Sequence, residues 1–292
     1  MLQDSKVQLL KNYFSEKQAV VLAFLFGSRS KAEQYQHLGS DWDIGVYFIP
    51  YEYMEIVTRE NYPAETGMWA DLVKICQSND VDLVVLNRAR PDLVFRVLSS
   101  GIPLTIKNRK LCLDLLSKTH YEAVDFRNFV FDFWQIRERS ASLSVEDRQS
   151  LIDYLVFLEE EFKELKDFRR FTWDDYGNNS FKRKAIERWV ENIAMSAIDI
   201  AKIILASDKK RIPQTYQELL KTFVAFYIQD WQEEKANIFS DFAKLRNIVV
   251  HEYLDMKWER IKVFIEQSEK LLPQFIGKVK AIVKINKETR YE

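Results

Sequence analysis

Residues able to bind phosphate and a divalent cation occur at three places in the first third of the 292-residue chain. Gly27 and Ser28 follow an apolar run, Asp41 and Asp43 come after a spacer of twelve residues, and Asp82 lies inside the apolar segment VDLVVL. Paired carboxylates are ligands for hard cations such as Mg²⁺, which also binds phosphate oxygens. A glycine lets the backbone approach a phosphate, and a serine offers N–H and hydroxyl donors. The pattern therefore indicates metal-assisted chemistry on a phosphate-containing substrate.

Strands must position these residues. Residues 19–26, 41–49, 81–86 and 102–106 have the apolar, β-branched and aromatic composition of short buried strands. Side chains alternate along a strand, so Asp41 and Asp43 share one face and Trp42 takes the other. If the strand at 81–86 pairs beside the strand at 41–49, Asp82 completes a three-carboxylate, two-metal cluster. Taken alone, an Asp-x-Asp pair is usually solvated, a Gly-Ser pair is usually a turn, and an aspartate such as Asp82 is usually a strand-end carboxylate. The order of all three along the chain favours a metal and phosphate site.

The two halves of the chain differ in pattern. Helices predicted at 3–17, 64–78 and 91–101 alternate with the strands, whereas only helical patterns follow Lys110, at 111–138, 146–169, 180–207, 214–226, 234–254 and 256–284. The small polar stretch SASLSVED, residues 140–147, is the best linker, and Ser144 with Asp147 predicts a helix N-cap. We therefore expect an α+β domain over residues 1–140 and an all-α domain over 141–292.

The first constellation resembles the DNA polymerase β-like nucleotidyltransferases, particularly the minimal (MNT) branch, over residues 5–135. The resemblance implies a small mixed sheet with helices, ATP as substrate, and Gly27 and Ser28 as nucleotide-binding residues. It also implies two Mg²⁺ ions on Asp41, Asp43 and Asp82, one activating the attacking hydroxyl and the other stabilising the leaving pyrophosphate. The spacer of twelve residues is longer than is usual in that family, so its effect on the nucleotide pose stays open.

A second constellation lies in FAKLRNIVVHEYLDM, residues 242–256, on a predicted helix. Arg246 and Tyr253 share a helix face, and Asn247 can reach His251. Arg246 and His251 are five residues apart, about 140° around a regular helix. A site that uses both is more easily built where two copies of the helix meet, or where the helix end is distorted. The alternative is a surface arginine, a capping-region histidine and a half-buried tyrosine.

This segment resembles the Arg-x4-His-x-Tyr signature of HEPN toxins, whose similarity to the chain extends as a helical pattern over residues 146–285. The resemblance implies an all-α HEPN helical bundle that cleaves RNA without metal at a dimer interface. His251 would act as general acid or base and Arg246 would stabilise phosphate charge, while Asn247 could fix the histidine ring. We therefore expect a homodimer, or a higher even-numbered assembly, built on the HEPN helices.

MNT and HEPN proteins commonly occur as adjacent toxin–antitoxin partners, in which the nucleotidyltransferase silences the nuclease by transferring AMP to the tyrosine of the HEPN motif. One chain with both resemblances implies a fused protein that modifies itself, with Tyr253 as AMP acceptor. The expected partners are ATP and an RNA, with tRNA among the candidates. The equally weighted alternative for Tyr253 is a tyrosine packed at the dimer interface.

Two other functions fit parts of the pattern. Antibiotic-modifying adenylyltransferases of the aminoglycoside type also join a Gly-Ser, Asp-x-Asp domain to a helical domain, but they have no need of Arg246 with His251. A catalytically inactive assembly module has no need of either constellation. Both alternatives therefore leave residues unexplained that the fused toxin–antitoxin interpretation uses.

The charge balance argues against a general polyanion binder. The chain has 43 basic and 44 acidic side chains, a net charge of −1, which leaves room only for a small, localised nucleic-acid site. The basic clusters Arg169-Arg170, Lys182-Arg183-Lys184 and Lys209-Lys210-Arg211 could guide an RNA backbone, and the alternative for each is a solvated helix end or loop. Cys76 and Cys112 belong to no CxxC pattern, and the longest apolar run, residues 19–26, is too short to span a bilayer. We expect a cytoplasmic protein with reduced thiols and no membrane contact.

Overall fold

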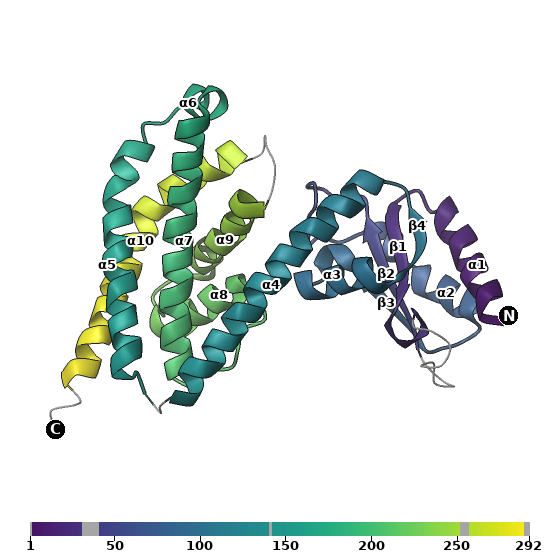
Figure 1. Ribbon diagram of the computed structural model, residues 1–292, viewed down its shortest axis with the longest axis horizontal. Coiled ribbons are helices and arrows are strands. Elements are labelled where there is room, and N and C mark those ends of the chain that lie inside the picture. Colours follow the sequence, from purple (N-terminus) through teal and green to yellow (C-terminus); the bar gives the residue numbers. More distant parts are fainter. Residues whose placement is uncertain (1, 31–40, 140–141, 252–256, 289–292) are drawn as a thin grey trace. The chain divides into compact units, whose positions relative to one another are not determined.

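A computed structural model describes residues 2–30, 41–139, 142–251 and 257–288 (Figure 1). The chain forms two compact units, Met1–Asp125 and Phe126–Glu292. Helix α4 (Arg109–Arg139) contributes to both, because Phe129 and Phe133 from its second half belong to the core of the second unit. The boundary expected between residues 140 and 141 falls outside the described residues, and the division between the units comes before it.

The first unit contains a four-stranded mixed sheet of order β3-β2-β1-β4. Strand β1 (Val20–Phe26) is antiparallel to β2 (Trp42–Phe48) and β4 (Ile102–Ile106), whereas β2 is parallel to β3 (Val81–Val85). The helices are α1 (Leu2–Glu16), α2 (Met68–Cys76) and α3 (Pro91–Ser100), and 3-10 turns occur at Gly27–Ser30 (η1), Pro63–Glu65 (η3) and Leu86–Arg88 (η4). The predicted α+β class is confirmed.

Both faces of the sheet are covered, which explains the continuous apolar runs of its central strands. On one face Trp42 packs in a cluster with Phe14 of α1 and Leu72 of α2. On the other face Tyr47 packs in a cluster with Val97 of α3. Neighbouring residues of β2, such as Val46 and Tyr47, therefore point into different cores.

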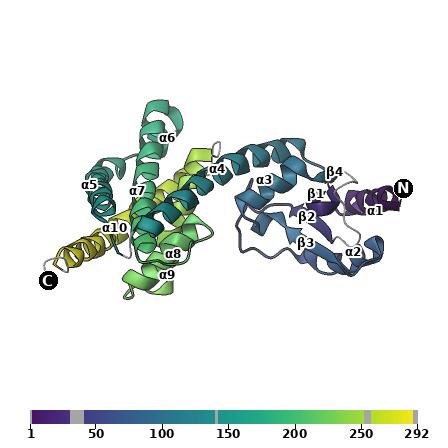
Figure 2. The same cartoon turned by 60° about the horizontal axis from the view of Figure 1, so that its bottom comes forward.

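The second unit is helical. Its helices are α5 (Val145–Phe168), α6 (Trp173–Asn178), α7 (Ser180–Ser207), α8 (Tyr216–Tyr227), α9 (Glu233–His251) and α10 (Lys257–Glu288). Helices α8 and α9 lie side by side in both views of the chain (Figures 1 and 2). The predicted N-cap is confirmed, since the Ser144 side chain accepts a hydrogen bond from the Asp147 N–H. The short helix α6 was not predicted.

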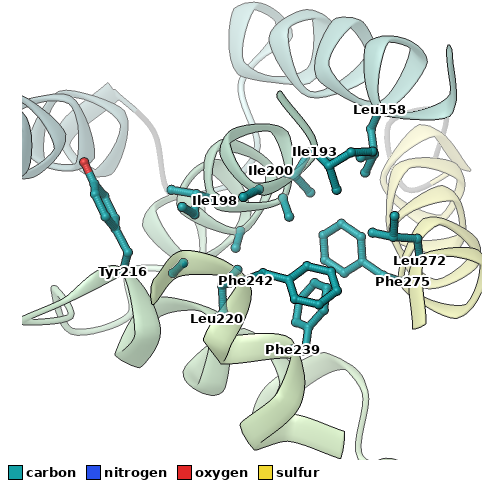
Figure 3. Close-up of a cluster of buried hydrophobic side chains, with 14 of the residues drawn as sticks. Leu158, Ile193, Ile198, Ile200, Tyr216, Leu220, Phe239, Phe242, Leu272 and Phe275 are labelled. Atoms are coloured by element: carbon teal, nitrogen blue, oxygen red, sulfur yellow. The ribbon is translucent and has the colours of Figure 1, made fainter. Parts of the chain in front are cut away.

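The core of this unit is built on α7, whose apolar face is almost wholly buried. Phe239 and Phe242 of α9 meet Phe275 of α10 beside Ile193 of α7 (Figure 3). This packing fixes α9, the helix that carries Arg246, Asn247 and His251 of the second constellation. Among the described residues, no helix is both long and apolar enough to cross a membrane.

Candidate functional sites

The first candidate site begins where β1 ends. Phe26 pairs with Asp43 across β1 and β2, and the chain then turns at Gly27 with a φ of +73°. Side chains rarely adopt that left-handed conformation, and a Cβ at residue 27 would also collide with Oδ2 of Asp43. The absence of a side chain at residue 27 therefore lets the Gly-Ser turn lie directly against the Asp43 carboxylate.

Strand pairing brings the second and third carboxylates to the same place. Strands β2 and β3 are parallel, with Asp43 opposite Asp82, so the strand of Asp82 does pair beside the Asp-x-Asp strand. Asp41 lies immediately before β2. Burial raises the pKa of the Asp43 carboxyl, and the negative charges of Asp82 and Asp41 raise it further, while Arg29 lowers it. The three carboxylates are therefore close enough to repel one another.

The donor chemistry of this site suits Mg²⁺. Within the described ranges, no three His, Cys, Asp or Glu side chains already form a group that could hold a metal ion. The carboxylates of Asp41, Asp43 and Asp82 nevertheless supply only oxygen ligands. Burial, and then the charges of Asp82 and Asp41, raise the pKa of Asp43, and a divalent cation would relieve the repulsion between these carboxylates. The residues present therefore fit the metal that the sequence implied.

Sequence reasoning did not identify Arg29 as part of this site. Its Nε donates a hydrogen bond of 3.1 Å to the Asp41 carbonyl, and its guanidinium lies 4.5 Å from the centre of the Trp42 ring. Arg29 thus connects the Gly-Ser turn to the start of the Asp-x-Asp strand. A cation one residue after Gly27-Ser28 was the available signal in the sequence.

The second candidate site lies on α9. Arg246 is only 6% exposed, its guanidinium lies 5.9 Å from the centre of the Tyr216 ring of α8, and its Nη1 donates a 3.1 Å hydrogen bond to Oδ1 of Asn247. Asn247, expected to fix the histidine ring, therefore binds the arginine in this structure. His251 is the last residue of α9, but its side chain and the whole of Tyr253 lie outside the described residues.

A polar cluster holds the end of α9. The buried Nζ of Lys257, the first residue of α10, donates a 3.2 Å hydrogen bond to the Val249 carbonyl and lies 3.6 Å from Oε1 of Glu187. The Tyr176 hydroxyl donates to the same Glu187 oxygen at 2.7 Å, and its ring stacks on Trp258. Residues of α6, α7 and α10 therefore meet at the C-terminal end of α9, and sequence reasoning did not identify them.

Two protein families match the chain. Residues 8–110 match the nucleotidyltransferase family of polymerase beta, and residues 158–279 match the family described as ribonuclease HepT-like. The first match includes Gly27, Ser28 and the three aspartates, and the second includes α9. No curated protein matches the sequence.

Three solved structures are similar to part of the chain. A toxin–antitoxin with AMP-PNP is 25% identical over 44% of this chain and 95% of its own, with a TM-score of 0.33. A mutant of the toxin–antitoxin MntA–HpeT is 24% identical over 42% of this chain and 95% of its own, with a TM-score of 0.32. A tri-AMPylated Shewanella oneidensis HEPN toxin in complex with MNT antitoxin is 24% identical over 43% and 96%, with a TM-score of 0.31.

Proposed function

We propose that this chain, which joins a polymerase β-type nucleotidyltransferase domain to a HepT-like HEPN domain, is a fused toxin–antitoxin protein that transfers AMP from Mg-ATP to its own HEPN tyrosine. The supporting observation is the parallel pairing of Asp43 with Asp82 beside the Gly27 turn. Nucleotidyl transfer requires carboxylates next to a phosphate-binding turn, and these elements meet at one edge of the sheet. ATP and RNA as substrates place the proposed reactions in the cytoplasm.

The chain's own residues account for positioning. The Gly27 turn presents backbone without a side chain, and the Ser28 N–H and hydroxyl would donate hydrogen bonds to phosphate oxygens. Mg²⁺ on Asp41, Asp43 and Asp82 would stabilise charge on the triphosphate and lower the pKa of the attacking hydroxyl. The Tyr253 oxygen would form a bond to the α-phosphorus of ATP, the bond to the β-phosphate oxygen would break with release of pyrophosphate, and the phenolic proton would pass to water.

The proposed modification would silence a metal-independent ribonuclease. His251 would transfer protons during RNA cleavage, and Arg246, held by Asn247, would stabilise phosphate charge. Tyr253 lies two residues beyond His251, so its AMP would place a phosphodiester charge and an adenosine next to the cleavage centre. We place this centre between two copies of α9, because residues 246 and 251 are five positions apart, about 140° around a regular helix. A monomer by light scattering at micromolar concentration would contradict that assembly.

Intact-mass spectrometry after incubation with Mg-ATP tests the transfer. The wild-type protein should gain mass in units of AMP, and Asp41→Ala should abolish the gain. Peptide mapping should place AMP on Tyr253, and Tyr253→Phe should resist modification there. AMP found only on other residues would overturn the acceptor assignment. Transfer to an added aminoglycoside, with none to the protein, would instead support the antibiotic-type enzyme.

Growth assays test the nuclease separately. Tyr253→Phe keeps the ring but removes the acceptor hydroxyl, so the variant should be more toxic to growing cells than the wild type. Adding His251→Ala should remove that toxicity, since the proton-transfer group is lost whatever the AMP state. Equal toxicity with and without His251 would show that the harm does not come from cleavage at this centre.

A further inference from the structure

A stripe of two exposed aromatic residues flanked by two arginines runs along the second half of α4. Arg127, Phe131, Trp134 and Arg137 follow one another at intervals of four, three and three residues, so they share a helix face. Phe131 is 63% exposed and Trp134 is 46% exposed, although the opposite face of the same segment supplies buried rings to the core. The exposed rings of the stripe are therefore not needed to pack this helix against the core.

Two residues from the loop and helix that follow α7 extend this stripe. The Nη1 of Arg137 donates a 2.7 Å hydrogen bond to the Lys210 carbonyl, and its guanidinium lies 5.5 Å from the centre of the Trp134 ring. The Nζ of Lys210 lies 4.0 Å from the centre of the Phe226 ring, which is 49% exposed. We refer to Arg127, Phe131, Trp134, Arg137, Lys210 and Phe226 as the aromatic–basic surface.

The loop adds further positive charge. Lys209 adopts a left-handed φ of 56° in the turn after α7, and both it and Arg211 are exposed beside Lys210. Two carboxylates on the same elements are already engaged, since Asp132 pairs with Lys202 at 3.4 Å and Asp208 accepts a hydrogen bond from Tyr227. A chain of net charge −1 thus carries a concentrated set of cations here.

We propose that the aromatic–basic surface binds single-stranded RNA. This proposal rests on the proposed ribonuclease function, and it gives the RNA substrate of that nuclease a binding surface in addition to the motif on α9. Exposed rings stack on unpaired bases, and arginine and lysine pair with phosphates along the same strand. The bases of a duplex are stacked internally and would leave the rings unused. A second copy of the chain is a poorer partner, because a two-fold axis through this surface would bring its cations close to the same cations of the other copy, where they would repel.

Fluorescence anisotropy with a labelled single-stranded RNA of roughly 12 nucleotides tests this surface. The measurement uses the full chain carrying His251→Ala, so that the probe stays intact. Trp134→Ala and Phe226→Ala should each weaken binding about tenfold, as expected for the loss of one stacked base, whereas Trp134→Phe should retain most of the affinity. Arg137→Gln should weaken binding and reduce its dependence on salt. Glu138→Gln should strengthen binding, because Glu138 is the exposed acid one turn beyond Trp134.

The chain offers matched controls on α5. Phe157 is an exposed ring and Lys163 an exposed cation, both outside the aromatic–basic surface, so Phe157→Ala and Lys163→Gln should leave RNA affinity unchanged. Equal affinity of Trp134→Ala and Phe157→Ala would overturn the proposal, as would an absence of RNA binding in the parent protein. A change in assembly mass with Trp134→Ala, without a change in RNA affinity, would show an interface between protein copies instead.

Failure of the proposed RNA-binding surface can be distinguished from failure of the proposed nuclease by measuring RNA cleavage and RNA binding separately. If His251 is intact and RNA is cleaved at an unchanged rate and affinity in Trp134→Ala, the surface assignment fails while the nuclease stands. If no RNA is cleaved but Trp134→Ala and Arg137→Gln still lose affinity, the surface stands and the nuclease assignment fails.

Discussion

Asp43 and Asp82 occupy directly opposite positions on the parallel strands β2 and β3, so two carboxylates are held on adjacent strands, which in sheets run roughly 4.8 Å apart. Asp41 adds a third negative charge before β2, and burial, followed by the charges of Asp82 and Asp41, raises the pKa of Asp43. We therefore expect these carboxylates to destabilise the folded domain while enabling its chemistry.

The first prediction follows from that repulsion. Because the pKa of Asp43 is raised in the folded state, its carboxylate form opposes folding at neutral pH, and Asp43→Asn should raise the melting temperature by about 2 °C while abolishing AMP transfer. The gain should shrink as pH falls through the raised pKa, because the wild-type carboxyl then becomes protonated. Calorimetry across pH measures both effects. Asp80→Asn is the control, since it removes one exposed charge outside the cluster.

The second prediction concerns the turn against Asp43. Gly27→Ala would force a methyl group into Oδ2 of Asp43 at a φ of +73°, so the Asp-x-Asp strand must shift and AMP transfer should fall at least about 100-fold, as for other misplaced catalytic groups. Gly67→Ala provides a matched comparison, because Gly67 has a φ of +80° with open space around its Cβ position. It should lower stability by about 1 kcal/mol through backbone strain yet leave transfer intact. Similar transfer rates in the two variants would contradict this explanation.

The third prediction concerns Arg29. A lysine at residue 29 keeps the positive charge but loses the planar group that stacks on Trp42 while donating to the Asp41 carbonyl. Arg29→Lys should therefore reduce the rate of AMP transfer about tenfold, the scale expected when one hydrogen bond to a positioned group is lost. Arg90→Lys is the control, since Arg90 forms only an exposed pair with Asp92 among the described contacts. Single-turnover kinetics by mass spectrometry would show equal rates for the two variants if Arg29 acted through charge alone.

The sequence predicted the strands and the carboxylate site because their signals are local. Apolar runs bounded by Gly27 and by Asp43 specify buried strands. Asp43 and Asp82 then come together if the strand of Asp82 lies next to the strand of Asp43, as it does in the structure. Helix α6 is only six residues long, so it has no apolar period to detect, although its capping box of Thr172 and Asp175 was visible in the sequence.

Other features depend on contacts between distant segments and could not be predicted from local patterns. Arg246 was expected as a phosphate-binding group, and its burial against Tyr216 depends on how α8 packs on α9. The aromatic–basic surface likewise exists because Arg137 reaches the carbonyl of Lys210 in another segment. The pattern identified the basic cluster of residues 209–211, but not the rings beside it.

The last prediction concerns Lys257, which connects the end of α9 to the start of α10. Its ammonium bonds the Val249 carbonyl, one of the last carbonyls of a helix without a partner inside that helix, and lies 3.6 Å from Glu187. Lys257→Met keeps most of the apolar stem but leaves that carbonyl and Glu187 without the cation. The variant should lose about 2 kcal/mol of stability, somewhat less than when a fully buried pair is broken, because Glu187 is partly exposed.

The matched control for this variant is Lys262→Met on the same helix, because Lys262 forms an exposed pair with Glu259. That change should leave the melting temperature within about 1 °C of the wild type, whereas Lys257→Met should lower it by roughly 4 to 8 °C. Hydrogen exchange should also accelerate in the last turn of α9, residues 248–251, and stay unchanged in α5. If the two lysine variants melt together and exchange alike, then Lys257 does not hold the helix end that carries His251, and the register of the motif must be fixed by the aromatic core of α9 alone.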